Sequence, residues 1–240
     1  LKKEWPQGMN IAKIPPTIEF APVRGIDPMY FPEDNKSLWS NWGSVTPAPD
    51  GSFYFTEGDH RGKDSRVSMW KYDPELRDCV RVLDFGALCG WYGRGVGDSK
   101  IHGDMGIMPD GVMWILTYWD PDPKPVPPEI EAKWPGSHLL TFDTRTGRAR
   151  DLGVLIPKAG WPQYQLDPER GKLFAVSFRS EVLSYDVNER RVAFFGFPPE
   201  GIAWDNRASL LDPTTGLFWC RAADTAGNIL SFDPRTNAFT

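Results

Sequence analysis

The 240-residue sequence predicts an all-β fold, a β-propeller of four-stranded antiparallel blades, because one phrase recurs four times. Each repeat has an apolar strand, a turn of the Pro-Asp-Gly type, a second strand, a loop, and a third strand ending on an aromatic residue and Asp. The four third strands end at Tyr72-Asp73, Phe142-Asp143, Tyr185-Asp186 and Phe232-Asp233. Their spacings of 70, 43 and 47 residues suit one blade per repeat.

The repeats place four blades in order along the chain. They are expected at about 39–88, 100–154, 161–197 and 205–240, the last still unfinished at its end. Strands are predicted near 43–47, 52–56, 67–72 and 80–85 in blade one, and near 104–108, 112–117, 138–142 and 149–153 in blade two. Closed propellers usually need more than four blades, so we expect part of a larger propeller, with a closed four-bladed ring as the alternative.

Two segments depart from the repeat. Residues 1–38 are rich in proline and irregular, as in a lead-in segment or a remnant of an earlier blade. Residues 120–136 carry six prolines and are expected to form a stiff insertion that stands out from blade two.

The amino-acid composition argues against several classes of partner and site. The 23 Gly and 23 Pro indicate frequent turns, and the net charge of −5 without a basic block argues against nucleic acid as a partner. No apolar run approaches the roughly 18 residues of a membrane span. Cys79, Cys89 and Cys220 are too few for a disulfide framework and lack zinc-site spacing. Buried free thiols are expected, with a Cys79–Cys89 disulfide across a hairpin as the alternative.

Blade connectivity gathers polar and aromatic residues on one face. The start of the first strand, the loop after the second and the start of the third share a face of a propeller, and all three histidines fall there. Tryptophan faces stack on sugars and arginine grips carboxylate or sulfate, so this face predicts an acidic polysaccharide or oligosaccharide as ligand. The candidate binding residues are Trp42, His60, Arg61, Lys100, Trp119, Trp161 and Arg207.

One stretch resembles a known family. Lys100-Ile101-His102, then Met108-Pro109-Asp110-Gly111-Val112-Met113-Trp114, then 134–143 and Asp151-Leu152-Gly153, are similar to the propeller polysaccharide lyases of the ulvan lyase type and their bacterial relatives, over about residues 98–190. The resemblance implies cleavage of a uronate-containing polysaccharide, sulfated or unsulfated, by β-elimination, in a secreted or periplasmic protein. No signal peptide is visible, although the N-terminal leader could simply be missing.

The resemblance also implies roles for particular residues. His102 would be an acid/base, Tyr164 its partner acid/base, and Arg179 the group that neutralises the carboxylate. The family usually has a second catalytic histidine after the second strand of this blade, and here that place reads Thr117-Tyr118-Trp119. Either Tyr118 takes its place, or His138 reaches in, or the chain is a relative that is not a lyase.

Two other functions stay open. A non-catalytic propeller could bind a carbohydrate or a protein on the same face. A metal-dependent hydrolase or lactonase could use Asp59, Asp104 and Asp205 as ligands. The leading hypothesis needs no cofactor for catalysis, while a structural divalent ion and the oligomeric state stay undetermined.

Overall fold

The computed structural model describes residues 14, 41–43, 45–58, 66–119, 127–222 and 227–240, and it confirms the predicted all-β propeller. The described residues contain sixteen strands in four antiparallel sheets of four strands each. In every sheet, strands that follow one another along the chain pair with one another. Each sheet is therefore one blade, built as a simple meander.

The strand bounds are as follows. Blade one contains β1 (Thr46–Pro47), β2 (Phe53–Gly58), β3 (Val67–Asp73) and β4 (Asp78–Asp84). Blade two contains β5 (Gly106–Ile107), β6 (Val112–Leu116), β7 (His138–Asp143) and β8 (Arg148–Val154). Blade three contains β9 (Gln163–Asp167), β10 (Lys172–Val176), β11 (Val182–Asp186) and β12 (Arg191–Gly196). Blade four contains β13 (Trp204–Leu211), β14 (Phe218–Ala222), β15 (Ile229–Asp233) and β16 (Ala238–Phe239).

Blade four differs from the expectation. The sequence indicated a blade still unfinished at residue 240, whereas the structure has a fourth strand there, β16, which pairs with β15 through Phe239 and Ala238. The first strands of blades one and two are also shorter than expected, at two residues each.

The recurring turns explain why the phrase repeats. Asp50 and Asp110 each accept a hydrogen bond from the backbone N–H two residues later, at 3.0 Å. The glycines that follow them, Gly51 and Gly111, both have φ of 83°, a conformation that favours glycine. The Asp after each aromatic residue has the same use: Asp73 accepts from the N–H of Glu75 at 2.9 Å. The motif thus closes the hairpin into the outermost strand.

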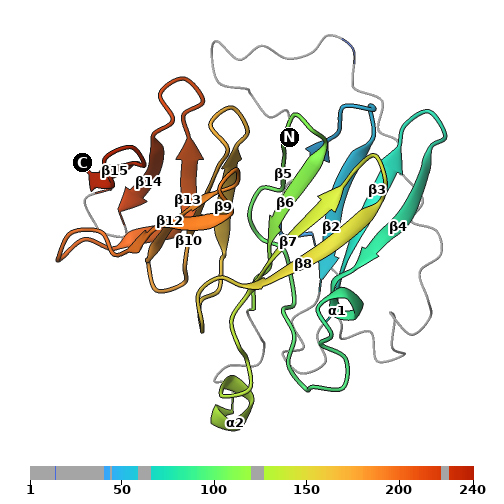
Figure 1. Ribbon diagram of the computed structural model, residues 1–240, viewed down its shortest axis with the longest axis horizontal. Coiled ribbons are helices and arrows are strands. Elements are labelled where there is room, and N and C mark those ends of the chain that lie inside the picture. The colour runs from blue at the N-terminus through green and yellow to red at the C-terminus, as the bar shows by residue number, and fades with distance from the viewer. Residues whose placement is uncertain (1–13, 15–40, 44, 59–65, 120–126, 223–226) are drawn as a thin grey trace, which may run out of the picture.

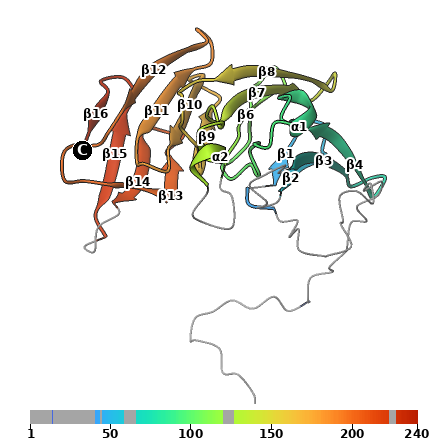
Figure 2. The same ribbon diagram turned by 90° about the horizontal axis from the view of Figure 1, so that it is seen from below.

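The blades follow one another around an arc (Figures 1 and 2). The first strands β1, β5, β9 and β13 lie along its inner side, and the fourth strands β4, β8, β12 and β16 lie along its outer side (Figure 2). Blades one and four lie at opposite ends of this arc, so the described residues do not form the closed four-bladed ring.

Apolar side chains join neighbouring blades. One buried cluster runs through blades one to three and includes Met69, Trp114 and Tyr164; a second joins blades three and four around Phe174 and Phe218. The junction of blades two and three depends on close approach: an ideal Cβ on Gly103 would lie 2.2 Å from Cδ1 of Tyr164. Only glycine leaves room for the ring there.

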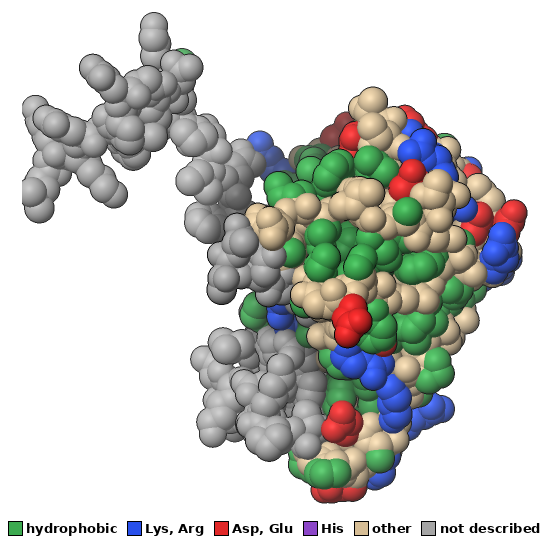
Figure 3. All heavy atoms as spheres, turned by 90° about the vertical axis from the view of Figure 1, so that its left-hand side faces the viewer, with side chains coloured by type: hydrophobic (Ala, Val, Ile, Leu, Met, Phe, Trp, Pro, Cys, Tyr) green, Lys and Arg blue, Asp and Glu red, His purple; other side chains and the backbone are tan. Residues whose placement is uncertain are grey.

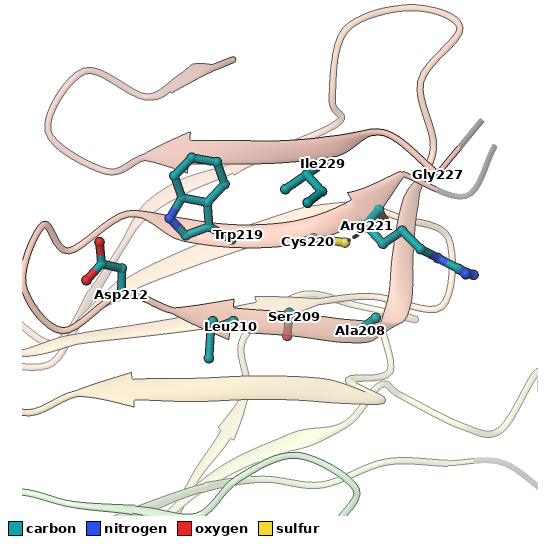
Figure 4. A pocket seen from close by; sticks show the side chains of 9 residues that line it. All are labelled: Ala208, Ser209, Leu210, Asp212, Trp219, Cys220, Arg221, Gly227 and Ile229. Carbon is teal, nitrogen blue, oxygen red and sulfur yellow. Dashed lines mark hydrogen bonds between the residues drawn. The ribbon is translucent and has the colours of Figure 1, made fainter. Parts of the chain in front are cut away.

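The far face of blade four is not covered by the described residues. Alternation along β14 sends Phe218 and Cys220 toward blade three, where they are buried, and leaves Trp219 on the other side. Leu210 and Ile229 are 63% and 68% exposed there. Figure 3 shows apolar side chains gathered on this side of the molecule. A shallow pocket of about 810 Å³ lies among them (Figure 4).

The two described helices are short. α1 (Phe85–Leu88) follows blade one and is capped by Asp84, whose Oδ1 accepts from the N–H of Ala87 at 3.0 Å. α2 (Pro128–Glu131) lies in the proline-rich insertion, for which the sequence predicted no helix. Pro128 fits the first helical turn, where its missing N–H costs nothing. Neither described helix has the length and apolarity needed to cross a membrane.

Candidate functional site

Blade two brings the segment that precedes β5 beside the segment that follows β6. Lys100 and Tyr118 form an isolated antiparallel bridge, and the N–H of Tyr118 donates to the carbonyl of Lys100 at 2.9 Å. The predicted sharing of one face by these two segments is therefore present in the structure. We call Trp42, Lys100, His102, Tyr118 and Arg207 the rim cluster.

His102 is the centre of the rim cluster. Its ring lies 6.3 Å from that of Trp42, nearly parallel at 15°, and 6.0 Å from that of Tyr118, edge-on at 84°. Nε2 of His102 contacts the guanidinium of Arg207, which comes from β13. Residues of blades one, two and four therefore meet at one imidazole.

Lys100 places a buried cation beside these rings. The residue is 2% exposed, and its Nζ lies 4.4 Å from the ring centre of Trp42 and 5.3 Å from that of Tyr118. Cation–π attraction to two aromatic faces compensates part of the lost hydration. Trp42 itself is 38% exposed, so the cation lies under a ring that solvent can reach.

The cluster lowers the pKa of His102 to about 4, through burial first and then through the positive charges of Arg207 and Lys100. The imidazole is therefore neutral at pH 7 and can accept a proton or a hydrogen bond. A neutral base flanked by two cations is an arrangement suited to an anionic ligand.

Arg179 and Trp119 line a separate pocket. It has a volume of about 510 Å³ and lies beside Trp134 and Phe178. The rings of Trp119 and Trp134 stack at 4.7 Å, while Arg179 Nε lies 3.4 Å from a carboxylate oxygen of Glu181. Trp134 and Phe178 were not among the predicted site residues, although each lies close in sequence to one of them.

This aromatic pocket adjoins the rim cluster. An ideal Cβ on Gly160 would lie 3.2 Å from Cδ1 of Phe178 and 3.3 Å from Cδ2 of Tyr118, so both rings pack on one glycine. The pocket and the cluster are therefore neighbouring parts of the same face.

Tyr164 and Trp161 lie in the core instead of on the predicted face. Neither has exposed surface. The ring of Tyr164 packs on Gly103, and burial raises the pKa of its hydroxyl well above the usual value. The ring of Trp161 packs edge-on against Phe195 at 6.4 Å. His102, Tyr164 and Arg179 therefore do not line a common pocket, because Tyr164 points between blades.

His138 points toward a different group of residues. Its Nδ1 lies 2.9 Å from Asp151, and its ring meets the edge of Trp91 at 5.7 Å. It does not take the place of a second histidine beside His102. The other two predicted binding residues, His60 and Arg61, lie outside the described residues.

The two described carboxylates that the sequence suggested for a metal hydrolase accept hydrogen bonds from neighbouring side chains. Asp104 accepts from Nε2 of Gln165 at 3.0 Å, and Asp205 accepts from Nη2 of Arg221 at 2.8 Å. Neither belongs to a group of three metal-ligating side chains in the part of the chain that the structure describes. Asp59 lies outside that part.

The comparisons with known proteins support the fold. The chain is similar to a solved structure of the Dos1 propeller, with a TM-score of 0.51 and 10% sequence identity. The match covers 84% of this chain and 46% of that one, so the chain spans less than half the length of its structural neighbour. No family model and no curated protein matches the sequence. At this identity the likeness shows a β-propeller, and the function has to be argued from the site.

Proposed function

We propose that the propeller binds a uronate-containing polysaccharide at the rim cluster and cleaves it by β-elimination, outside the cytoplasm. The observation that carries the proposal is the neutral His102 held between Arg207 and Lys100, beneath the exposed ring of Trp42. The resemblance around Lys100-Ile101-His102 supports the same chemistry.

The reaction needs a cation for the C6 carboxylate, a base for the C5 proton and an acid for the departing O4. Arg207 is exposed and would pair with the carboxylate, with Lys100 adding positive charge from below. His102 would take the C5 proton, the C4–O4 bond would break as the C4–C5 double bond forms, and the Tyr118 hydroxyl would protonate the leaving oxygen. No cofactor enters these steps.

Substrate would improve His102 as a base. The charges of Arg207 and Lys100 hold its pKa low in the free protein, together with burial. A bound carboxylate compensates those charges, so the pKa of His102 should rise toward its ordinary value. The aromatic pocket beside Tyr118 would then accept the neighbouring sugar against Trp119.

A specific observation favours a second candidate, a propeller that binds the acidic sugar without cleaving it. Tyr164 is buried and Arg179 lies in the adjoining pocket, so the acid/base and neutralising pair implied by the resemblance is not assembled around His102.

The test incubates the full-length protein with ulvan and other polyuronates and follows ultraviolet absorbance of the new double bond, with calorimetry for binding. We expect His102→Ala and Tyr118→Phe to lower the rate about 100-fold or more while binding persists. Arg207→Ala should abolish both binding and cleavage. Arg235→Ala removes an exposed arginine elsewhere in blade four and should change neither.

The outcomes separate the candidates. Binding that depends on Arg207 without any absorbance change identifies the non-catalytic propeller. Absence of both binding and absorbance change with every acidic polysaccharide rejects both candidates. Loss of cleavage in Tyr164→Phe would show that the catalytic pair is the one implied by the resemblance.

A further inference from the structure

A second cluster, Cys89, His138 and Asp151, shares no residue with the rim cluster. Cys89 caps the C-terminal end of α1, His138 begins β7, and Asp151 lies on β8. One thiol sulfur, one imidazole nitrogen and one carboxylate oxygen all lie within 4.8 Å of one another. Three elements, one from the connection after blade one and two from blade two, thus converge on one point.

The three side chains are held in place by their surroundings. Nδ1 of His138 lies 3.0 Å and 2.9 Å from the two oxygens of Asp151. The backbone N–H of His138 donates to the hydroxyl of Thr117 at 2.7 Å, and Trp91 packs edge-on against the imidazole. Asp151 also accepts from the N–H of Gly153 at 2.8 Å. Such support keeps donor atoms oriented for a ligand.

We propose that Cys89, His138 and Asp151 bind one Zn²⁺ ion, with a fourth position open to water. Sulfur, nitrogen and oxygen donors together suit zinc, whereas calcium and magnesium prefer oxygen alone. The side chains of His138 and Asp151 are 12% and 23% exposed, so the open position faces solvent, while Cys89 approaches from the buried side.

Binding has a defined proton balance. The Cys89 thiol releases its proton to solvent as the zinc–sulfur bond forms, and His138 coordinates through a nitrogen that carries no proton. The ion would tie the connection that follows blade one to β7 and β8, so it would stabilise the junction of the first two blades. Linear spacing of cysteines does not reveal this site because its three donors come from separate elements. The proposal is independent of the sugar site.

The test uses the full-length protein after removal of metal. Titration with Co²⁺ should give one equivalent bound and a thiolate-to-cobalt absorption band, which one equivalent of Zn²⁺ should displace. Cys89→Ala, His138→Ala and Asp151→Asn should each weaken Zn²⁺ binding by about tenfold or more. Cys79→Ala and Cys220→Ala remove the other buried thiols and serve as matched controls that keep the band.

A second readout guards against misfolded variants. Zn²⁺ should slow modification of Cys89 by a thiol reagent in the wild-type protein and in Asp104→Asn, a carboxylate outside the cluster. Absence of stoichiometric metal, a cobalt spectrum without the thiolate band, or Zn²⁺ affinity that is unchanged in Cys89→Ala would each overturn the proposal.

Discussion

The junction between blades two and three and the far face of blade four are both apolar surfaces of the same kind of sheet. At the junction Gly103 lets the Tyr164 ring lie directly on the backbone of blade two, and the ring loses all contact with solvent. On blade four Leu210 and Ile229 stay more than half exposed around a shallow pocket (Figures 3 and 4).

The difference shows where stability resides in this architecture. Each blade buries its faces against its neighbours, so an apolar residue contributes its transfer free energy only where a second blade covers it. Residues with similar sequence character should therefore respond very differently to truncation at the two surfaces.

The largest effect is expected at the covered surface. Tyr164→Ala should lower the free energy of unfolding by roughly 3–5 kcal/mol because it leaves a cavity between blades. Trp219→Ala, on the far face of blade four, should cost about 1 kcal/mol or less. Urea denaturation of both variants measures the contrast, and equal losses would mean that the far face is covered in solution.

Gly103 should contribute nearly as much as Tyr164 to stability at the junction of blades two and three. Gly103→Ala places a Cβ 2.2 Å from the Tyr164 ring and 2.5 Å from its backbone nitrogen, so blades two and three have to separate. We expect a loss of about 1–3 kcal/mol. Ala208→Ser adds an atom on the far face of blade four and should stay within about 0.5 kcal/mol. A tolerated Gly103→Ala in the same denaturation assay would contradict the close approach.

Apolar residues on the far face of blade four should affect solubility more than the free energy of unfolding. Leu210→Ser should change the free energy of unfolding by about 0.5 kcal/mol or less and should reduce concentration-dependent self-association, because large exposed apolar patches promote contacts between molecules. Sedimentation velocity at several concentrations checks this expectation. A strongly destabilised variant would count against an uncovered face.

The last expected effect concerns the pH dependence of stability at the rim cluster. The folded pKa of His102, about 4, lies below the ordinary value of 6.5. Between these values the unfolded chain holds a proton that the folded protein lacks, so stability falls as pH drops from 6.5 toward 4. His102→Gln should flatten this dependence, as measured by denaturation at pH 7 and pH 5. An unchanged slope would show that His102 titrates normally.

The sequence predicted the meander well because its cues are local. The Asp-Gly turns and the aromatic-Asp ends each fix a hairpin through contacts within a few residues. Hairpin connectivity also placed Lys100, His102 and Tyr118 on one face correctly.

Other features depend on information that the sequence pattern does not carry. Whether Tyr164 points to the rim or between blades depends on the strand's register, and a shift of one residue reverses the answer. The contact of Arg207 with His102 depends on how the blades are arranged around the arc, and the proximity of Cys89 to Asp151 depends on how a connection packs on blade two.

The contact between Arg207 and His102 joins side chains that are 105 positions apart in the chain and belong to blades that are not consecutive. If blades two and four moved apart, the Arg207 guanidinium would leave His102. The pKa of His102 would then rise because one nearby positive charge would be gone. The protonation of one histidine therefore responds in part to the packing of two blades that are not adjacent.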